Sequence, residues 1–90
     1  PDTDEIFLID KNGIVKGMID IIKILKASDE KKITDFVEEV PLAFDYLTST
    51  EDLVYKFRQY ETKFAIVIDE NQRMIGIIYS HKILEFNGLF

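Results

Sequence analysis

The sequence contains one pattern twice, at an offset of 59 residues. Residues 7–25 align without a gap on residues 66–84. The identical pairs include Asp10/Asp69, Asn12/Asn71, Gly17/Gly76, Ile19/Ile78, Lys23/Lys82, Ile24/Ile83 and Leu25/Leu84. An internal repeat requires both copies to fold as the same supersecondary unit, so we expect two matched units in this chain.

Each copy predicts the order strand, turn, strand and helix. The β-branched runs 6–9 and 65–68 are typical of strands. The polar tetrads 10–13 and 69–72 predict hairpin turns, because Asp and Asn bond their own backbone and Asn or Gly tolerates positive φ. Gly17 and Gly76 then interrupt the second apolar run, which indicates a bulge or a close backbone approach. Asp20 is expected to cap the helix that follows in the first copy.

The segment between the two repeats completes only the second copy. Residues 29–37 are expected to form a short helix or linker, and residues 40–44 a short strand. Ser49 opens a helix whose apolar face carries Leu53 and Phe57. The second copy is therefore β-α-β-β-α, whereas the first lacks its leading β-α. The prediction is an α/β (α+β) fold with a partial first motif at 1–28, a linker at 29–39 and a second motif at 40–90.

Composition excludes several functions. The net charge of −6 and dispersed lysines disfavour nucleic-acid binding. Cysteine is absent and His81 is the single histidine, so no zinc set, no catalytic residue and no metal site are expected. No apolar run reaches the roughly 18 residues that span a bilayer. We expect a cytoplasmic location, including that of a cytosolic domain of a membrane-associated protein, no direct membrane insertion, and no enzymatic activity.

The repeated unit resembles the cystathionine β-synthase (CBS) motif. The resemblance rests on the strand, the Asp turn, the spacing to glycine and the following helix, all present twice between about residues 5 and 86. It implies that the two motifs pair with pseudo-twofold symmetry, and that modules dimerise. It also implies that a cleft between motifs binds an adenosine-type ligand such as AMP, ADP, ATP or S-adenosylmethionine.

Parts of the chain are similar to the CBS motifs of three different transport systems. Phe57-Arg58 followed by residues 63–70 is similar to the second motif of haemolysin-like magnesium and cobalt efflux proteins. Residues 7–21 are similar to the paired motifs of osmoprotectant ABC-transporter ATPases, and the compact spacing suits a magnesium-channel cytosolic domain. The resemblance therefore implies a regulatory module attached to a transporter or enzyme.

The expected ligand contacts depart from the family pattern. Nucleotide-binding members carry Gly-h-h-Thr/Ser-x-x-Asp, where h is apolar and the Asp accepts hydrogen bonds from the ribose. Here the corresponding positions are Asp20 with Lys23, and Tyr79 with Lys82. Lysine has no lone pair to offer a ribose hydroxyl. Three interpretations stay open: adenosine binding is lost, the lysines contact ligand phosphates, or both lysines are solvated surface.

Phe44, Ile66 and Tyr79 are candidates to flank a purine ring, although apolar and aromatic residues at strand positions are more often core. The predicted function is a sensory regulatory module. Its alternatives are a ligand-free dimerisation module and a magnesium-sensing domain. Because the first copy lacks its leading β-α, we also expect an uncovered apolar surface that a longer chain or a homodimer covers.

Overall fold

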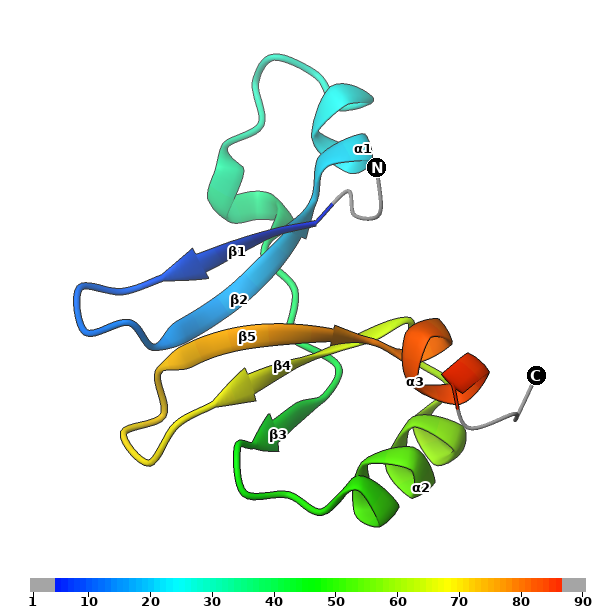
Figure 1. The fold of residues 1–90 in the computed structure, drawn as a ribbon. Helices are drawn as coiled ribbons and strands as arrows, with labels where there is room; N and C mark the ends of the chain where they lie inside the picture. Colours follow the sequence, from blue (N-terminus) through cyan, green and yellow to red (C-terminus); the bar gives the residue numbers. More distant parts are fainter. Residues whose placement is uncertain (1–4, 87–90) are drawn as a thin grey trace. The chain divides into compact units, whose positions relative to one another are not determined.

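The computed structural model describes residues 5–86, with the side chains of residues 84–86 left aside. The chain divides into two units, residues 1–39 and residues 40–90, and each is described by itself. Both contain strands and short helices, which is the mixed α/β fold that the repeat predicted (Figure 1).

The first unit is an antiparallel hairpin followed by two short helices. Strand β1 (Glu5–Ile9) pairs with β2 (Val15–Asp20), and α1 (Ile21–Leu25) continues directly from β2. The predicted linker helix is a single 3-10 turn, η1 (Ile33–Phe36). The apolar side chains of α1 are largely exposed, and Leu25 is 75% exposed. This unit therefore keeps little apolar core of its own among the described residues.

The second unit has a three-stranded sheet and two helices. Its elements are β3 (Ala43–Asp45), α2 (Thr50–Tyr60), β4 (Phe64–Ile68), β5 (Met74–Tyr79) and α3 (Ser80–Phe86). The strand order is β3-β4-β5, with β3 parallel to β4 and β5 antiparallel to it. Strand β3 begins at Ala43, three residues later than the predicted start at Val40, and Pro41 before it has no N–H to donate.

Helix α2 supplies the core of the second unit. The Ser49 hydroxyl accepts a hydrogen bond from the Asp52 amide at 3.2 Å, and this N-cap starts the helix as the sequence predicted. Leu53 and Phe57 then fall on one face because they are one turn apart. Both are buried, and they pack with Leu42, Phe44 and Ala65.

The two copies share one turn and one bulge. Gly13 and Gln72 occupy equivalent turn positions with φ of 84° and 65°. In β2 the register shifts opposite Leu8 and Ile9, and in β5 it shifts opposite Val67 and Ile68. The bulge beside each glycine is confirmed, and the repeat in sequence is a repeat in backbone geometry.

Candidate functional site

The first candidate position lies where β2 enters α1. The Asp20 side chain accepts a hydrogen bond from the Ile22 amide at 2.9 Å, which confirms the predicted N-cap. Asp20 has an extended backbone, as an N-cap residue requires. One carboxylate oxygen is therefore already used by the first turn of the helix.

Lys23 has a partner inside its own unit. Its ammonium lies 2.8 Å from Glu38 Oε1, and the two side chains remain 55% and 43% exposed. The hydrogen bond and the charge of Glu38 raise the pKa of Lys23 above its ordinary value. Lys23 is therefore an exposed lysine that carries an ion pair, and the three interpretations stay predictions.

Glu38 reaches this place because its backbone lies against β2. The Met18 amide donates to the Glu38 carbonyl at 2.9 Å, and the Glu38 amide donates to the Met18 carbonyl at 2.8 Å. Gly17 permits the approach: a Cβ there would lie 2.5 Å from Val37 Cγ1 and 3.0 Å from the Glu38 oxygen. The close backbone approach predicted at Gly17 is thus confirmed.

The equivalent positions of the second unit are arranged differently. Tyr79 ends β5 half-buried, with its ring centroid 6.1 Å from that of His81. The Ser80 hydroxyl donates to the Lys63 carbonyl at 3.2 Å. Lys82 lies exposed on α3, and its ammonium forms no ion pair with the described side chains of residues 5–83. The symmetric lysines of the sequence therefore have different surroundings.

Phe44 and Ile66 lie in the interior of the second unit. Phe44 is 3% exposed and packs edge-to-face on Phe57, with ring centroids 5.4 Å apart. Ile66 is 4% exposed, and its amide donates to the Leu42 carbonyl at 3.1 Å. This burial favours the core role that the sequence offered as the alternative. Contact of either residue with a purine ring stays a prediction.

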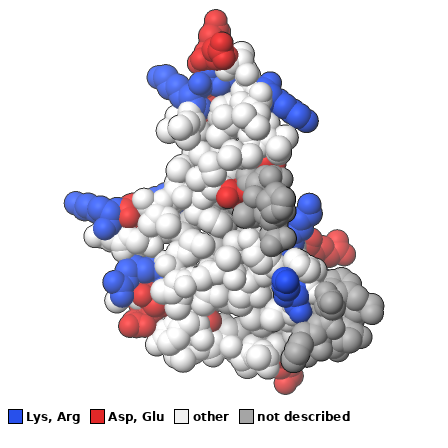
Figure 2. All heavy atoms as spheres, turned by 45° about the horizontal axis from the view of Figure 1, so that its top comes forward, with Lys and Arg blue, Asp and Glu red and all other residues white. Residues whose placement is uncertain are grey.

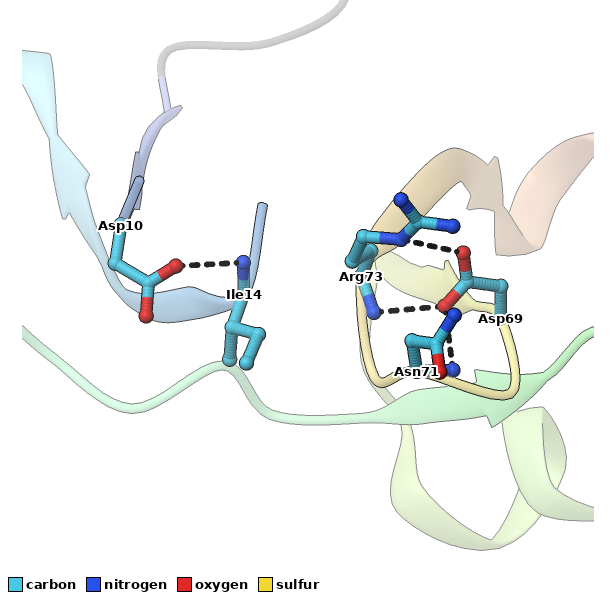
Figure 3. A network of polar contacts seen from close by, with 5 residues as sticks. All are labelled: Asp10, Ile14, Asp69, Asn71 and Arg73. Atoms are coloured by element: carbon cyan, nitrogen blue, oxygen red, sulfur yellow. Dashed lines mark hydrogen bonds and ion pairs between the residues drawn. The ribbon is translucent and has the colours of Figure 1, made fainter. Parts of the chain in front are cut away.

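Both hairpin turns hold a set of polar contacts that the site prediction omitted. Asp10 Oδ1 accepts from the Asn12 and Ile14 amides at 2.8 and 3.0 Å. Asp69 Oδ1 accepts from the Asn71 and Arg73 amides at the same two distances (Figure 3). The repeated Asp-x-Asn at residues 10–12 and 69–71 was the sequence signal for this network.

Each turn carboxylate also meets a cation. The Arg73 Nε donates to Asp69 Oδ2 at 3.0 Å, and the Lys16 ammonium lies 3.7 Å from Asp10 Oδ2. The Arg73 amide contributes most to a lowered pKa of Asp69, and the Ile14 amide does so for Asp10. These groups hold the turns, so we assign them a structural role.

None of the six predicted ligand positions lines the hollow of the first unit. This hollow of about 200 Å³ lies between α1 and η1. Its lining consists of Ile24, Ala27, Ser28, Asp29, Lys31, Lys32, Ile33 and Phe36. Among the side chains that the structure describes, residues 5–83, no three of His, Cys, Asp or Glu gather into a group that could hold a metal ion.

Charged side chains are dispersed over the face of the molecule that Figure 2 draws. On the face drawn in Figure 2, basic and acidic side chains lie interspersed and neither sign forms a continuous patch. This agrees with the absence of a basic stripe from the sequence. In the described part of the chain, no helix has the length and apolarity needed to cross a membrane.

Two matched hairpin-and-helix units, one completed by a leading strand and helix, define a tandem α/β repeat module. The CBS domain family model matches residues 33–87, and the chain belongs to that family. No curated protein matches the sequence. As a CBS-domain protein, the chain is a regulatory module.

Solved structures share the fold at low identity. Staphylococcus aureus OpuCA matches with a TM-score of 0.82 and 21% identity, over 96% of this chain and 74% of that chain. The cytosolic domain of the Mg²⁺ channel MgtE in complex with ATP matches with a TM-score of 0.77 and 19% identity, over 92% of this chain and 34% of that chain. The CBS domain pair of protein MJ0100, in complex with 5′-methylthioadenosine and S-adenosyl-L-methionine, matches with a TM-score of 0.72 and 23% identity. This match covers 94% of this chain and 70% of that chain.

Proposed function

We propose that this chain is the regulatory module of a larger, transport-related protein, that it acts on the cytosolic side and that it has no catalytic residue of its own. The support is the combination of the CBS family with the fold of OpuCA and of the MgtE cytosolic domain. This chain spans about a third of that MgtE chain. A module of this size therefore fits a regulatory part joined to a transporter.

We further propose that its signal is an adenosine-type ligand contacted through phosphate. The observation that carries this proposal is the difference between the two lysines. Lys23 is paired with Glu38, whereas the exposed Lys82 ammonium has no acidic partner among the described side chains of residues 5–83. An ammonium donates hydrogen bonds and attracts phosphate oxygens, but it accepts nothing from a ribose hydroxyl. Lys82 is accordingly the proposed phosphate contact.

Thermal unfolding with AMP, ADP, ATP and S-adenosylmethionine tests the ligand proposal. A ligand at 100 times its Kd adds about 2.7 kcal/mol to the free energy of unfolding. We expect the phosphate-bearing nucleotides to raise Tm more than S-adenosylmethionine, which lacks phosphate. Lys82→Ala should remove the increase, whereas Lys56→Ala, an exposed lysine on α2, should keep it. If no compound moves Tm at millimolar concentration, adenosine sensing is rejected.

A ligand-free homodimerisation module is the second candidate. Two observations favour it. The ammonium of Lys23, at a predicted ligand position, already pairs with Glu38. Each unit also exposes large apolar side chains, including Leu25 at 75% and Leu47 at 76%. Tm should then rise with protein concentration. A monomer at micromolar concentration in sedimentation equilibrium would reject this candidate. Magnesium sensing is the third hypothesis. A Mg²⁺ titration that shifts neither Tm nor the amide NMR signals would reject it.

A further inference from the structure

Each hairpin turn places an asparagine directly before a residue in the left-handed conformation. The pair is Asn12–Gly13 in the first turn and Asn71–Gln72 in the second, with φ of 84° and 65° at the second residue of each pair. Both asparagines are exposed, and neither carboxamide takes part in a hydrogen bond with the part of the chain that the structure describes. The two turns therefore present the same side-chain group in matched backbone geometry and differ in the residue that follows it.

An asparagine side chain can react with the main chain of the residue that follows it. The main-chain nitrogen of that residue loses its proton to hydroxide and attacks Cγ of the asparagine. A bond from nitrogen to Cγ forms, the bond from Cγ to Nδ2 breaks, and the leaving nitrogen takes a proton from water and departs as ammonia. Water then opens the cyclic imide at either carbonyl, which gives aspartate or isoaspartate. The net reaction adds water and releases ammonia, so water is the only co-reactant.

The residue after the asparagine decides how easily this attack occurs. A Cβ on that residue lies next to the attacking nitrogen, obstructs its approach to Cγ and restricts the main-chain rotation that the approach requires. Glycine has no Cβ and rotates freely. Gly13 therefore favours the reaction at Asn12, whereas the side chain of Gln72 hinders it at Asn71.

Hydrogen bonds of the turn determine how often the attacking nitrogen is free. The Gly13 amide donates to the Asp10 carbonyl at 3.0 Å, and the Gln72 amide donates to the Asp69 carbonyl at the same distance. Base removes the proton of a hydrogen-bonded amide only when the structure opens locally. The rate at each asparagine thus depends on how firmly its turn is held.

The first turn is held less firmly than the second. The side chain of Asp69 is 11% exposed and accepts a hydrogen bond from Arg73 Nε at 3.0 Å. The side chain of Asp10 is 26% exposed and lies 3.7 Å from the Lys16 ammonium. Local opening is most frequent where few buried apolar contacts hold the chain, and neither helix of the first unit buries a residue. Turn opening therefore favours Asn12, as the chemistry of the following residue does.

We propose that Asn12 is a deamidation site of the folded chain, at which the Gly13 nitrogen attacks Cγ and the turn held by Asp10 sets the rate. Asn71, in the matched turn, keeps its amide. Isoaspartate at residue 12 adds a methylene group to the main chain of the turn. Because loop length fixes the register of a hairpin, this product destabilises the pairing of β1 with β2. The modification thus acts on one of the two motifs.

Incubation of the chain in mildly alkaline water enriched in heavy oxygen, followed by peptide mapping with mass spectrometry, tests the proposal. We expect residue 12 to become a mixture of aspartate and isoaspartate that carries heavy oxygen, while Asn71 stays intact in the same sample. Asn12 should react at least about tenfold faster when the same chain is unfolded in urea, because the Gly13 amide is then free. The isoaspartate form, separated by chromatography, should have a lower Tm than the untreated chain.

Gly13→Gln and Gln72→Gly are the matched variants, because they exchange the residues that follow the two asparagines. Glutamine already occupies this turn position in the second copy, so Gly13→Gln should keep the turn and protect residue 12. Gln72→Gly should make residue 71 reactive.

A second pair of variants tests the control by the turn. Asp10→Ala removes the acceptor of two main-chain amides and should speed the reaction at Asn12 in the folded chain by at least about fivefold. Asp69→Ala makes the same change in the other turn and should leave the rate at Asn12 as it is.

Three results would overturn the proposal. One is an Asn12 that stays intact in the folded chain over the time in which the unfolded chain is converted. Another is an Asn71 that reacts as fast as Asn12, which would show that the following residue does not decide the reaction. The third is an equal rate at Asn12 in the folded chain, in urea and in Asp10→Ala, which would show that the turn exerts no control. None of these results bears on the ligand proposal, whose test uses Lys82.

Discussion

The Lys23 ammonium lies 2.8 Å from Glu38 Oε1, so the lysine at the predicted ligand position of the first copy already pairs with a carboxylate. The contact joins α1 to the segment that bridges Met18. Lys82 has the same sequence position in the second copy and no ion pair with the described side chains of residues 5–83. Identical residues in the two repeats therefore have different surroundings, because Glu38 lies beside Lys23 and not beside Lys82.

The pKa of Lys23 provides a direct check of this pair. Glu38 raises it above the ordinary 10.5 through a hydrogen bond and its charge. The stabilisation is therefore complete below 10.5 and is lost as the pH rises through the higher folded-state pKa. We expect an NMR titration of the Lys23 side chain to give a raised pKa, and the raised value to disappear in Glu38→Gln. An unchanged pKa in this variant would contradict the pairing.

The turn carboxylates should make the fold sensitive to acid. Main-chain amides lower the pKa of Asp10 and Asp69 below the ordinary 3.8. Their stabilisation is present above that value and is lost as the pH falls through the lower folded-state pKa. Urea unfolding between pH 7 and pH 2 should show a smaller acid loss in the double variant Asp10→Asn, Asp69→Asn. Glu70→Gln, at an exposed carboxylate, is the control and should behave as the parent.

Gln72 should be replaceable by glycine with a gain in stability. Its φ of 65° lies in the left-handed region, where its repeat counterpart is Gly13. The Cβ of a non-glycine residue costs about 1–2 kcal/mol in this region, less the entropy that glycine loses on folding. We expect Gln72→Gly to add about 0.5–1 kcal/mol to the free energy of unfolding. Gly13→Ala is the reverse experiment and should destabilise, and equal effects of the two changes would refute the reasoning.

Phe57 should be the most costly truncation in the second unit. It is 1% exposed and packs edge-to-face on Phe44. Truncation of a buried Phe to Ala costs about 3–5 kcal/mol, a large part of the stability of a small domain. Tyr55→Ala, on the same helix at 62% exposure, should cost well under half as much in the same thermal unfolding experiment. Similar costs for both would show that α2 does not carry the core.

Much of the fold could be predicted from local patterns. The hairpin turns follow from Asp and Asn bonding their own backbone, and Asp10 and Asp69 do so at matching distances. The Ser49 and Asp20 caps depend on residues within three positions along the chain. The start of β3 at Ala43 was missed, because strand ends depend on pairing with β4, which is distant in sequence.

The candidate site was harder to predict for the same reason. The sequence identified Lys23 and Lys82 as equivalent, and it could not show that Glu38 lies beside only one of them. Phe44 and Ile66 were offered either as core or as ligand contacts. Their burial, at 3% and 4% exposure, was decided by α2 and the neighbouring strands.

The repeat by itself determined the family, the order of the elements and the geometry of both turns, because these depend on short stretches of the chain. The tertiary structure decided which of the equivalent positions in the two copies has a neighbouring segment packed against it. Val37 and Glu38 lie against β2, so the space at Gly17 is filled and Lys23 is paired. A Cβ at Gly76 would meet nothing within 4 Å, and Lys82 has no ion pair with the described side chains of residues 5–83. Such contacts depend on segments distant in sequence, and a local pattern carries no record of which of two equal sites such a segment will occupy.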